Sequence, residues 1–181
     1  IDILLLLQID RIYQALTRLI DDCSSERLAS RLGEDRAIVR QGHGSVIIDG
    51  PFENFSLGQH SHLKSDTYIH TAGGVSIGRY FHTGRGLTIF SSRHVWRCAE
   101  TIPYARESEL SPVKIGDFVW FGANVTVLPG TTVEDGCVIG ADSVLRGHYP
   151  RGSVVIGNPA VIVGYRDEKH FEEKLREGAY F

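Results

Sequence analysis

The sequence predicts an all-β solenoid, a parallel β-helix with short helices before it and one helix after it. The main observation is a strict six-residue repeat between Val113 and Leu145, in which every first position is aliphatic or aromatic. These first positions are Ile115, Phe121, Val127, Val133, Ile139 and Leu145. A second series of smaller residues stands two positions earlier, from Val113 to Ser143. No helical period fits this spacing, whereas a hexad repeat is typical of parallel β-helices.

Each hexad supplies one short strand and a turn, and its apolar residue points into a prism-shaped interior. No hexad can bury its apolar face alone, so the stability comes from stacking on the neighbouring coils. The 20 glycines among 181 residues fit a fold with many tight turns. Repeats of this kind can be scaffold and nothing more, so function has to be sought where the pattern breaks.

Composition excludes several classes of protein. The length suits one domain that can bury a core, and a net charge of −3 gives no basic surface for nucleic acid. Cys23, Cys98 and Cys137 are odd in number and far apart, which favours reduced thiols in a cytoplasmic protein over a disulfide framework. The opening run IDILLLL is too short to span a bilayer and lacks the basic flank of a signal peptide. We therefore expect no transmembrane segment, with interfacial membrane contact as the minor alternative.

Residues 1–36 are expected to form a helical segment. Apolar residues recur at helical spacing and predict an amphipathic helix over about residues 3–23. Ser24 and Ser25 can cap a second short helix, which Gly33 can end. These helices are expected to cover one open end of the solenoid, where unpaired strand groups would otherwise invite association.

The β-helix itself is predicted over residues 37–163. Two strands with glycine turns lead into it, hexads are visible from Leu57, and their frame slips by two residues before Ile77. The pattern then breaks over residues 95–112, VWRCAETIPYARESELSP, which are mixed, charged and carry two prolines. A loop this long within a regular solenoid is unusual unless it is functional. It must protrude, because the interior of a β-helix cannot hold it.

Residues 164–181 are predicted to form a C-terminal helix that packs on the outside of the last coil. Asp167 can cap this helix, Phe171 and Leu175 share one of its faces, and Gly178 can end it.

At this point a family resemblance becomes specific. The segments FVWFGANVTVLPGTTVEDGCVIGADSVL, residues 118–145, and VVIGNPA, residues 154–160, resemble the hexapeptide-repeat acyltransferases. The likeness is greatest to the O-acetyltransferases of galactosides, maltose and bacterial surface polysaccharides, and it covers about residues 57–166. It implies a left-handed β-helix and a homotrimer with active sites between the subunits. It also implies acetyl-CoA as co-substrate, a saccharide acceptor and no metal.

The resemblance also implies roles for particular residues. In this family a histidine stands just before a protruding loop, and the segment LTIFSSRH puts His94 there. The residues that match the coenzyme contacts of the family are Trp120, Gly122, Ala123, Gly140, Ala141, Arg146 and Arg166. Where the family has a lysine or arginine after its NPA segment, this sequence has Val161. Arg146 or Arg166 would then supply the charge for the phosphates of the coenzyme.

Acetyl transfer from a thioester to a hydroxyl needs a group that accepts the hydroxyl proton. Histidine suits this role, because its pKa lies near the working pH, so His94 is the candidate general base. Backbone N–H groups can stabilise the tetrahedral intermediate, and small residues let the pantetheine arm approach the backbone closely. Asp66 matches polar acceptor-binding positions of related enzymes. Trp96 and Tyr104 could stack on a sugar ring or pack the loop onto the next subunit.

Other functions remain open at this stage. The acceptor could be an amine of an amino sugar or nucleotide sugar, and the β-helix could be a non-catalytic scaffold for which His94 is dispensable. A γ-carbonic-anhydrase-like hydratase is a more distant alternative, because that class shares the β-helix and binds zinc through histidines. Its ligands include two histidines five residues apart, a pair that this sequence lacks. We expect His70, His82 and His94 to lie on different faces and to form no metal site within one chain.

Overall fold

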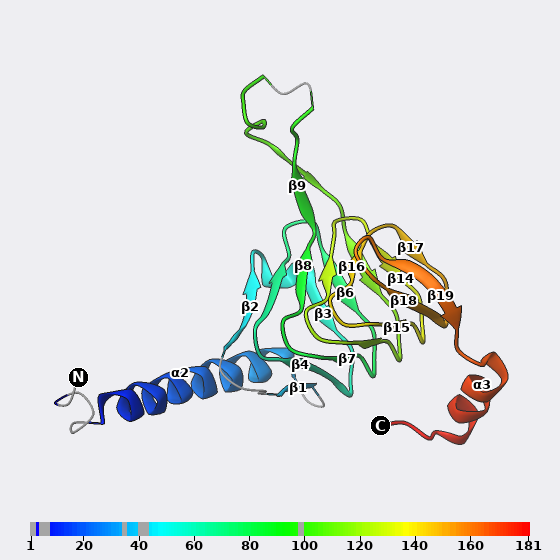
Figure 1. The fold of residues 1–181 in the computed structure, drawn as a ribbon, viewed down its shortest axis with the longest axis horizontal. Coiled ribbons are helices and arrows are strands. Elements are labelled where there is room, and N and C mark those ends of the chain that lie inside the picture. Colours follow the sequence, from blue (N-terminus) through cyan, green and yellow to red (C-terminus); the bar gives the residue numbers. More distant parts are fainter. Residues whose placement is uncertain (1–2, 4–7, 34–35, 40–43, 98–99) are drawn as a thin grey trace.

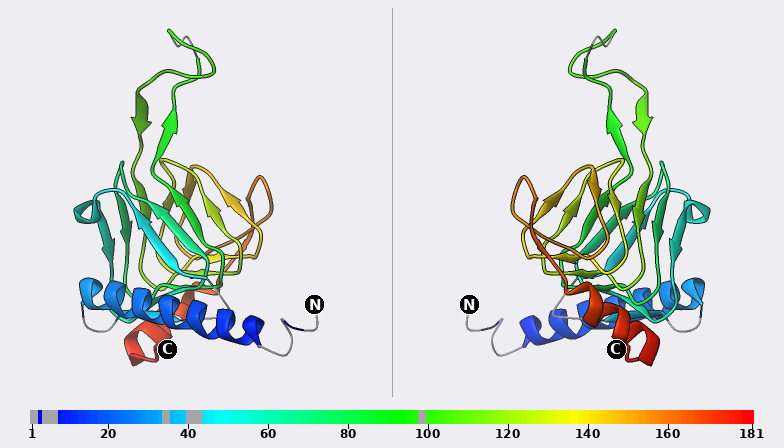
Figure 2. Two further views of the ribbon diagram at one scale, coloured as in Figure 1. Left: turned by 90° about the vertical axis from the view of Figure 1, so that its left-hand side faces the viewer. Right: turned by 90° about the vertical axis from the view of Figure 1, so that its right-hand side faces the viewer.

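The computed structural model describes the chain except for residues 1–2, 4–7, 34–35, 40–43 and 98–99, and gives only the backbone of residues 36–39. Its strands wind into a parallel β-helix of triangular cross-section (Figures 1 and 2). Three sheets, here called A, B and C, form the three faces. The chain passes through A, B and C in turn, so one coil consists of three strands.

The strands of each sheet stack along the solenoid axis. Sheet A contains β1 (Arg36–Val39), β4 (Ser61–Lys64), β7 (His82–Thr83), β12 (Trp120–Phe121), β15 (Val138–Ile139), β18 (Ser153–Ile156) and β19 (Val161–Tyr165). Sheet B contains β2 (Val46–Asp49), β5 (Thr67–His70), β8 (Thr88–Phe90), β13 (Thr126–Val127) and β16 (Val144–Leu145). Sheet C contains β3 (Phe55–Leu57), β6 (Val75–Ile77), β11 (Val113–Ile115), β14 (Thr132–Val133) and β17 (His148–Tyr149). A short 3-10 helix, η1 (Phe52–Asn54), precedes β3.

The interior confirms the sequence prediction of the hexad repeat. All six first-position residues from Ile115 to Leu145 are at most 4% exposed, and the smaller second series from Val113 to Ser143 is buried as well. The rings of Phe81 and Phe121 meet edge to face inside the prism, with centroids 5.1 Å apart. Because parallel pairing keeps equivalent residues in register, each apolar side chain stacks on its counterpart one coil away.

The turns form three columns along the edges of the prism. The AB corner comprises residues 65–66, 84–87, 122–125 and 140–143. The BC corner comprises residues 50–54, 71–74, 91–112, 128–131 and 146–147. The CA corner comprises residues 58–60, 78–81, 116–119, 134–137 and 150–152. The two-residue slip of the hexad frame before Ile77 falls in the BC corner, between β5 and β6.

A hairpin leaves the solenoid at the BC corner. β9 (Ser92–His94) and β10 (Ser108–Leu110) pair antiparallel and project far from the prism (Figures 1 and 2). The predicted protruding loop is thus present, but it starts earlier than residue 95. His94 lies inside the first strand of the hairpin and not ahead of it.

The N-terminal segment differs from the prediction of two helices. A single helix, α2 (Ile9–Leu32), continues through Ser24 and Ser25 and ends at Gly33. Its C-terminal part packs beside β1, with Leu28 buried and Leu32 against the core. Its N-terminal part projects away from the coils (Figure 1), so only part of the helix serves as the expected cover. The opening run that precedes α2 lies mostly outside the described residues.

The C-terminal end of the solenoid also differs from the prediction, because its last strand runs in the opposite direction. β19 runs antiparallel to β18, with a register shift between Val154 and Val155. The parallel coils therefore end with β18, so residues 161–163, which the sequence assigned to the β-helix, belong to a hairpin instead. The helix α3 (Glu168–Glu177) follows as predicted: Asp167 caps it by accepting from the backbone N–H of His170, and Gly178 ends it with φ 65°. No helix in the described part of the chain is long and apolar enough to cross a membrane.

Candidate active site

The root of the hairpin positions His94. In the β9–β10 ladder, Ser108 lies opposite His94 and Glu109 lies opposite Arg93. The Arg93 guanidinium donates two hydrogen bonds to the Glu109 carboxylate, at 3.0 and 2.7 Å. A bidentate pair of this kind fixes geometry more than a single contact does. It holds the register that brings Ser108 to His94.

The imidazole of His94 has two neighbours within the hairpin. Its Nδ1 lies 3.4 Å from the hydroxyl oxygen of Ser108. Its ring lies nearly parallel to that of Tyr104, with centroids 4.0 Å apart and an interplanar angle of 16°. Among the described residues, none bonds to its Nε2, and the His94 side chain is exposed. The ring is therefore held from one side and open to a reactant at Nε2.

The two aromatic candidates in the hairpin behave differently. One face of the Tyr104 ring stacks on the imidazole of His94. Tyr104 is therefore a neighbour of the imidazole as well as a candidate for contact with a sugar. Trp96 is 66% exposed and carries the Arg97 guanidinium 4.8 Å from its ring centroid. Trp96 makes no ring contact with His94 in the described structure, so it stands apart from the imidazole.

Five of the predicted residues share the AB corner. Asp66, Gly122, Ala123, Gly140 and Ala141 all lie there, Asp66 two coils before Gly122 and Ala123, and Gly140 and Ala141 on the coil after them. A Cβ at Gly122 would come within 2.6 Å of the backbone nitrogen of Ala141. Coil stacking alone therefore requires this glycine. Ala141 is exposed and Ala123 half-exposed, so these two residues leave an edge of backbone without bulky side chains.

Asp66 takes part in the turn itself. Its φ is 61°, in the left-handed region that Asp and Asn tolerate better than most residues, and its carboxylate forms an ion pair with Arg85. Asn124 and Asp142 occupy the same corner on later coils, joined by a 3.1 Å hydrogen bond. Asp66 is therefore exposed at the right corner for a substrate contact, but it is already partnered.

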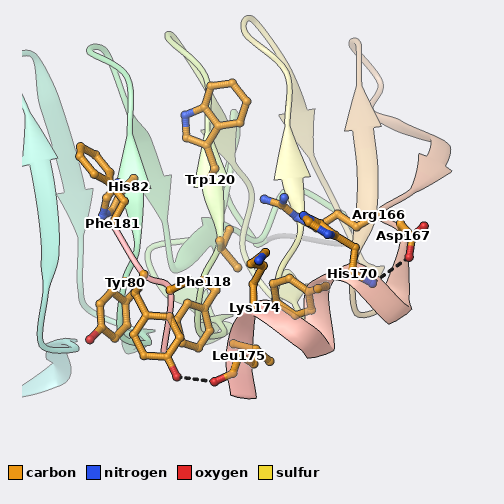
Figure 3. Close-up of a pocket in the computed structure, with 14 residues that line it drawn as sticks. Tyr80, His82, Phe118, Trp120, Arg166, Asp167, His170, Lys174, Leu175 and Phe181 are labelled. Atoms are coloured by element: carbon orange, nitrogen blue, oxygen red, sulfur yellow. Dashed lines mark hydrogen bonds between the residues drawn. The ribbon is translucent and has the colours of Figure 1, made fainter. Parts of the chain in front are cut away.

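The remaining coenzyme candidates are dispersed. Trp120 lies on the outer face of sheet A and is 54% exposed. Arg166 lies at the CA corner, where its Nε donates to the carbonyl of Gly136 at 2.6 Å, and burial lowers its pKa. Figure 3 shows both residues at the rim of a surface pocket of about 420 Å³ between sheet A and α3. Arg146 lies at the BC corner and is exposed.

The predicted residues thus fall into separate groups on one chain. His94, Trp96, Tyr104 and Arg146 belong to the BC corner, whereas Gly122, Ala123, Gly140, Ala141 and Asp66 belong to the AB corner. Sheet B lies between these corners, and at 3.3 Å per residue a strand with its turns spans about 15 Å. A single chain therefore does not bring the imidazole to the exposed backbone edge.

Comparisons with known proteins identify the fold. The bacterial transferase hexapeptide family (six repeats) matches residues 112–147. Over 142 residues the chain is 30% identical to a Staphylococcus aureus (strain MRSA252) protein described as an acetyltransferase, covering 74% of this chain and 68% of that protein. The chain belongs to the hexapeptide-repeat acetyltransferase family.

Two further relatives extend this assignment. A protein of Escherichia coli K12, described as a lipopolysaccharide biosynthesis O-acetyl transferase, is 38% identical over 122 residues, which are 62% of each chain. The chain thus spans somewhat less than two thirds of that relative. A hexapeptide-repeat acetyltransferase of Vibrio cholerae, solved with acetyl coenzyme A, superposes with a TM-score of 0.66 over 89% of this chain and 86% of that one, at 21% identity. The fold is the left-handed β-helix of this family.

The other histidines of this hexapeptide-repeat protein form no metal site in the part of the chain that the structure describes. His70 lies on sheet B and His82 on sheet A, as expected, and His94 is in the hairpin. The sequence did not predict that the rings of His62 and His82 contact each other across adjacent coils, with centroids 4.3 Å apart and planes tilted by 47°. Burial, with smaller effects of His82 and Lys64, lowers the pKa of His62 to about 4.

The sequence did not indicate Ser108, the residue that lies at Nδ1 of His94. It is 14 positions from His94 and lies outside the hexad pattern. Only the hairpin register brings the two side chains together.

Proposed function

We propose that the chain is an acetyl-CoA-dependent O-acetyltransferase that acetylates a saccharide hydroxyl, with His94 as general base, in the cytoplasmic biosynthesis of a surface polysaccharide. The observation that carries this proposal is the geometry of His94. The hairpin holds its imidazole by Nδ1 and by one ring face, and Nε2 is open. Membership of an acetyltransferase family, and the relative described as a lipopolysaccharide O-acetyl transferase, support the choice of reaction and acceptor.

The chemistry requires one base and no covalent enzyme intermediate. As the acceptor oxygen attacks the thioester carbon, Nε2 of His94 takes the hydroxyl proton. The tetrahedral intermediate collapses with cleavage of the carbon–sulfur bond, and the imidazolium returns the proton to the leaving thiolate. The products are an acetyl ester and free coenzyme A, and His94 is neutral again. Backbone N–H groups at a turn would stabilise the oxyanion.

The donor would lie along the AB corner. The edge at Ala123 and Ala141 offers backbone groups without bulky side chains, which suits an extended pantetheine arm. The acetyl coenzyme A complex of the Vibrio cholerae protein supports this choice of donor. Of the two arginines, Arg146 suits the phosphates better, since Arg166 already donates through Nε to the carbonyl of Gly136. Trp120 would approach the donor from the outer face of sheet A, two residues before Gly122.

The separation of the two corners supports an active site between subunits in a homotrimer. A cyclic trimer closes a head-to-tail contact, in which the BC corner of one subunit meets the AB corner of the next. Sheet B would then face the three-fold axis. Its outer face carries Ile47, 50% exposed, and Phe90, 37% exposed, which are apolar groups that such an interface would cover. This arrangement would bring His94 to the donor edge of its neighbour.

The acceptor would bind beside the hairpin, with Trp96 as an exposed ring for a pyranose face and Asp66 of the neighbouring AB corner as a polar contact. An amino sugar is the second candidate acceptor, because the same base serves an amine. A scaffold without catalysis is the remaining alternative, and it predicts that His94 has no chemical role.

The direct test is release of coenzyme A from acetyl-CoA in the presence of individual saccharides and nucleotide sugars. We expect release that depends on the saccharide and that falls by roughly 10²–10⁴-fold in kcat/KM for His94→Ala. His170→Ala is the matched control, because that histidine is exposed on α3, far from the hairpin. Equal and slow release by all three proteins with every acceptor would favour the scaffold.

A further inference from the structure

The hairpin provides an uncharged partner for Nδ1 of His94. Ser108 is held opposite His94 by the antiparallel ladder, and its hydroxyl oxygen lies 3.4 Å from Nδ1. The neighbouring cross-strand pair, Arg93 and Glu109, satisfies its own charges through two hydrogen bonds. Because successive side chains of a strand point to opposite faces, this ion pair lies on the other face of the ribbon.

The identity of the partner decides which tautomer of His94 is present. A neutral imidazole carries one N–H, and the nitrogen without it is the base. If Nδ1 donates to the Ser108 oxygen, Nε2 keeps its lone pair and points to the open side. If Nδ1 accepts instead, Nε2 carries the proton and cannot act as a base. A hydrogen bond at one ring nitrogen therefore determines the reactivity of the other.

Tyr104 fixes the plane of the same ring. Its backbone carbonyl accepts a 2.7 Å hydrogen bond from the Thr101 hydroxyl, which holds the loop where the two rings stack at 4.0 Å. A stacked phenol blocks one face of the imidazole and restricts its rotation. Its π face also stabilises a positive charge nearby, such as the imidazolium that forms during transfer.

We propose that Ser108 and Tyr104 are the positioning residues of His94: Ser108 accepts a hydrogen bond from Nδ1 and leaves Nε2 as the base, and Tyr104 holds the ring and stabilises its charged form. This inference rests on the proposed role of His94. The described hairpin brings no carboxylate to Nδ1, so the site orients its histidine with a neutral hydroxyl.

Kinetics of Ser108 variants test the first half of the proposal. We expect Ser108→Ala to lower kcat by roughly five- to tenfold, the effect of one lost hydrogen bond, with the KM for acetyl-CoA nearly unchanged. Ser108→Thr should retain most of the activity because it keeps the hydroxyl. Ser108→Asp places a carboxylate at Nδ1 and should move the pH of half-maximal kcat/KM upward by about one unit. Glu107→Gln is the control, since Glu107 is an exposed residue of the same hairpin that the described structure does not place in contact with His94, and its pH profile should match the wild type.

Tyr104 variants test the second half. Tyr104→Phe keeps the ring and should behave as wild type, whereas Tyr104→Leu should lower kcat by about threefold. A readout apart from activity is the ¹⁵N spectrum of the imidazole, assigned with His94→Asn. It should show the Nδ1–H tautomer in the wild type and a mixture in Ser108→Ala.

The outcomes separate the inference from the proposed function. If His94→Ala abolishes activity while the Ser108 and Tyr104 variants keep the wild-type kcat, pH profile and tautomer, the positioning roles are wrong and the base stands. If His94→Ala retains full activity, the proposed function itself fails. An Nε2–H tautomer in the wild-type spectrum would overturn the role of Ser108 whatever the kinetics show.

Discussion

The ring of Phe171 lies directly over Gly136. A Cβ at Gly136 would come within 2.7 Å of Cζ of Phe171. On the preceding coils the equivalent corner positions carry His60, Tyr80 and Phe118, whose rings stack on one another at 4.8 and 4.9 Å. Glycine replaces the aromatic residue on the next coil, and α3 supplies a ring from outside. This exchange anchors the C-terminal helix to the solenoid.

Gly136→Ala is therefore expected to weaken the docking of α3 and the stability of the fold. The added methyl group collides with the ring, which costs about 1–3 kcal/mol, and φ is 70° at this position, which adds about 1 kcal/mol. Urea unfolding measures the sum. Gly147→Ala is the matched control, because Gly147 also has a positive φ but nothing lies within 4 Å of its Cβ position. An equal loss of stability in both variants would mean that the contact with Phe171 contributes nothing.

The partial burial of His62 beside His82 predicts a loss of stability in mild acid. The folded-state pKa of His62 is lowered from 6.5 to about 4. Between these values the unfolded chain binds a proton that the folded chain does not, so stability is complete above pH 6.5 and falls as the pH drops towards 4. His62 is only half-buried, and screening reduces the effect to about 1–2 kcal/mol.

Unfolding in urea at pH 7.5, 6, 5 and 4.5 measures this dependence. His62→Gln should flatten the curve between pH 6.5 and 4, whereas His148→Gln, at an exposed histidine paired with Glu134, should leave that part of the curve in place. If both variants lose stability in acid as steeply as the wild type, the dependence comes from other groups.

The cysteines are expected to differ sharply in reactivity. Cys137 is fully buried, and burial raises the pKa of its thiol, so little thiolate is present and no reagent can reach it. Cys23 is exposed on α2. Cys98 lies outside the described residues, so the measurement uses Cys98→Ser. In native buffer an aromatic disulfide reagent should label one thiol quickly and the second only after unfolding. Two fast thiols would contradict the packing of Cys137.

Mixed oligomers test whether the active site lies between subunits. His94→Ala removes the base, and Ala141→Trp blocks the donor edge with a bulky ring at an exposed position. Each variant alone should be inactive. When the two are unfolded together and refolded in equal amounts, about a quarter of the head-to-tail contacts combine an intact His94 with an intact Ala141. Activity should therefore return to about that fraction of the wild-type value.

The control for this experiment is refolding each variant alone, which should restore nothing. Light scattering on the wild type should give three times the mass of one chain. If the refolded mixture stays inactive while it forms trimers, then His94 and the donor edge do not act across subunits.

The repeat allowed the core to be predicted residue by residue, because burial in a solenoid follows directly from the period. Side-chain contacts off the repeat could not be predicted. The approach of Ser108 to His94 depends on the hairpin register, which no local pattern specifies, and the stacking of Tyr104 depends on how the loop returns. The sequence placed His94 just before the loop, whereas the residue lies inside the first strand of the hairpin, and it gave no means of separating the two corners.

The N-terminal helix shows how a local signal can mislead. Ser24 and Ser25 favour a helix start, yet the structure continues through them because serine is tolerated on an exposed helical face. The burial of Leu28 and the packing of Leu32 against the core stabilise one long helix over two short ones. Tertiary contact overrides the capping preference here.

The hairpin enters and leaves the solenoid without disturbing the coils on either side. β11 pairs with β6 with Val113 opposite Val75, and β13 pairs with β8 with Val127 opposite Ile89, as though residues 91–112 were an ordinary corner. The scaffold is therefore mechanically independent of the length and composition of the insertion. Segments of another length or composition could therefore be grafted into the hairpin without disturbing the coils that carry the proposed donor edge, provided that Ser108 and Tyr104 are kept beside His94.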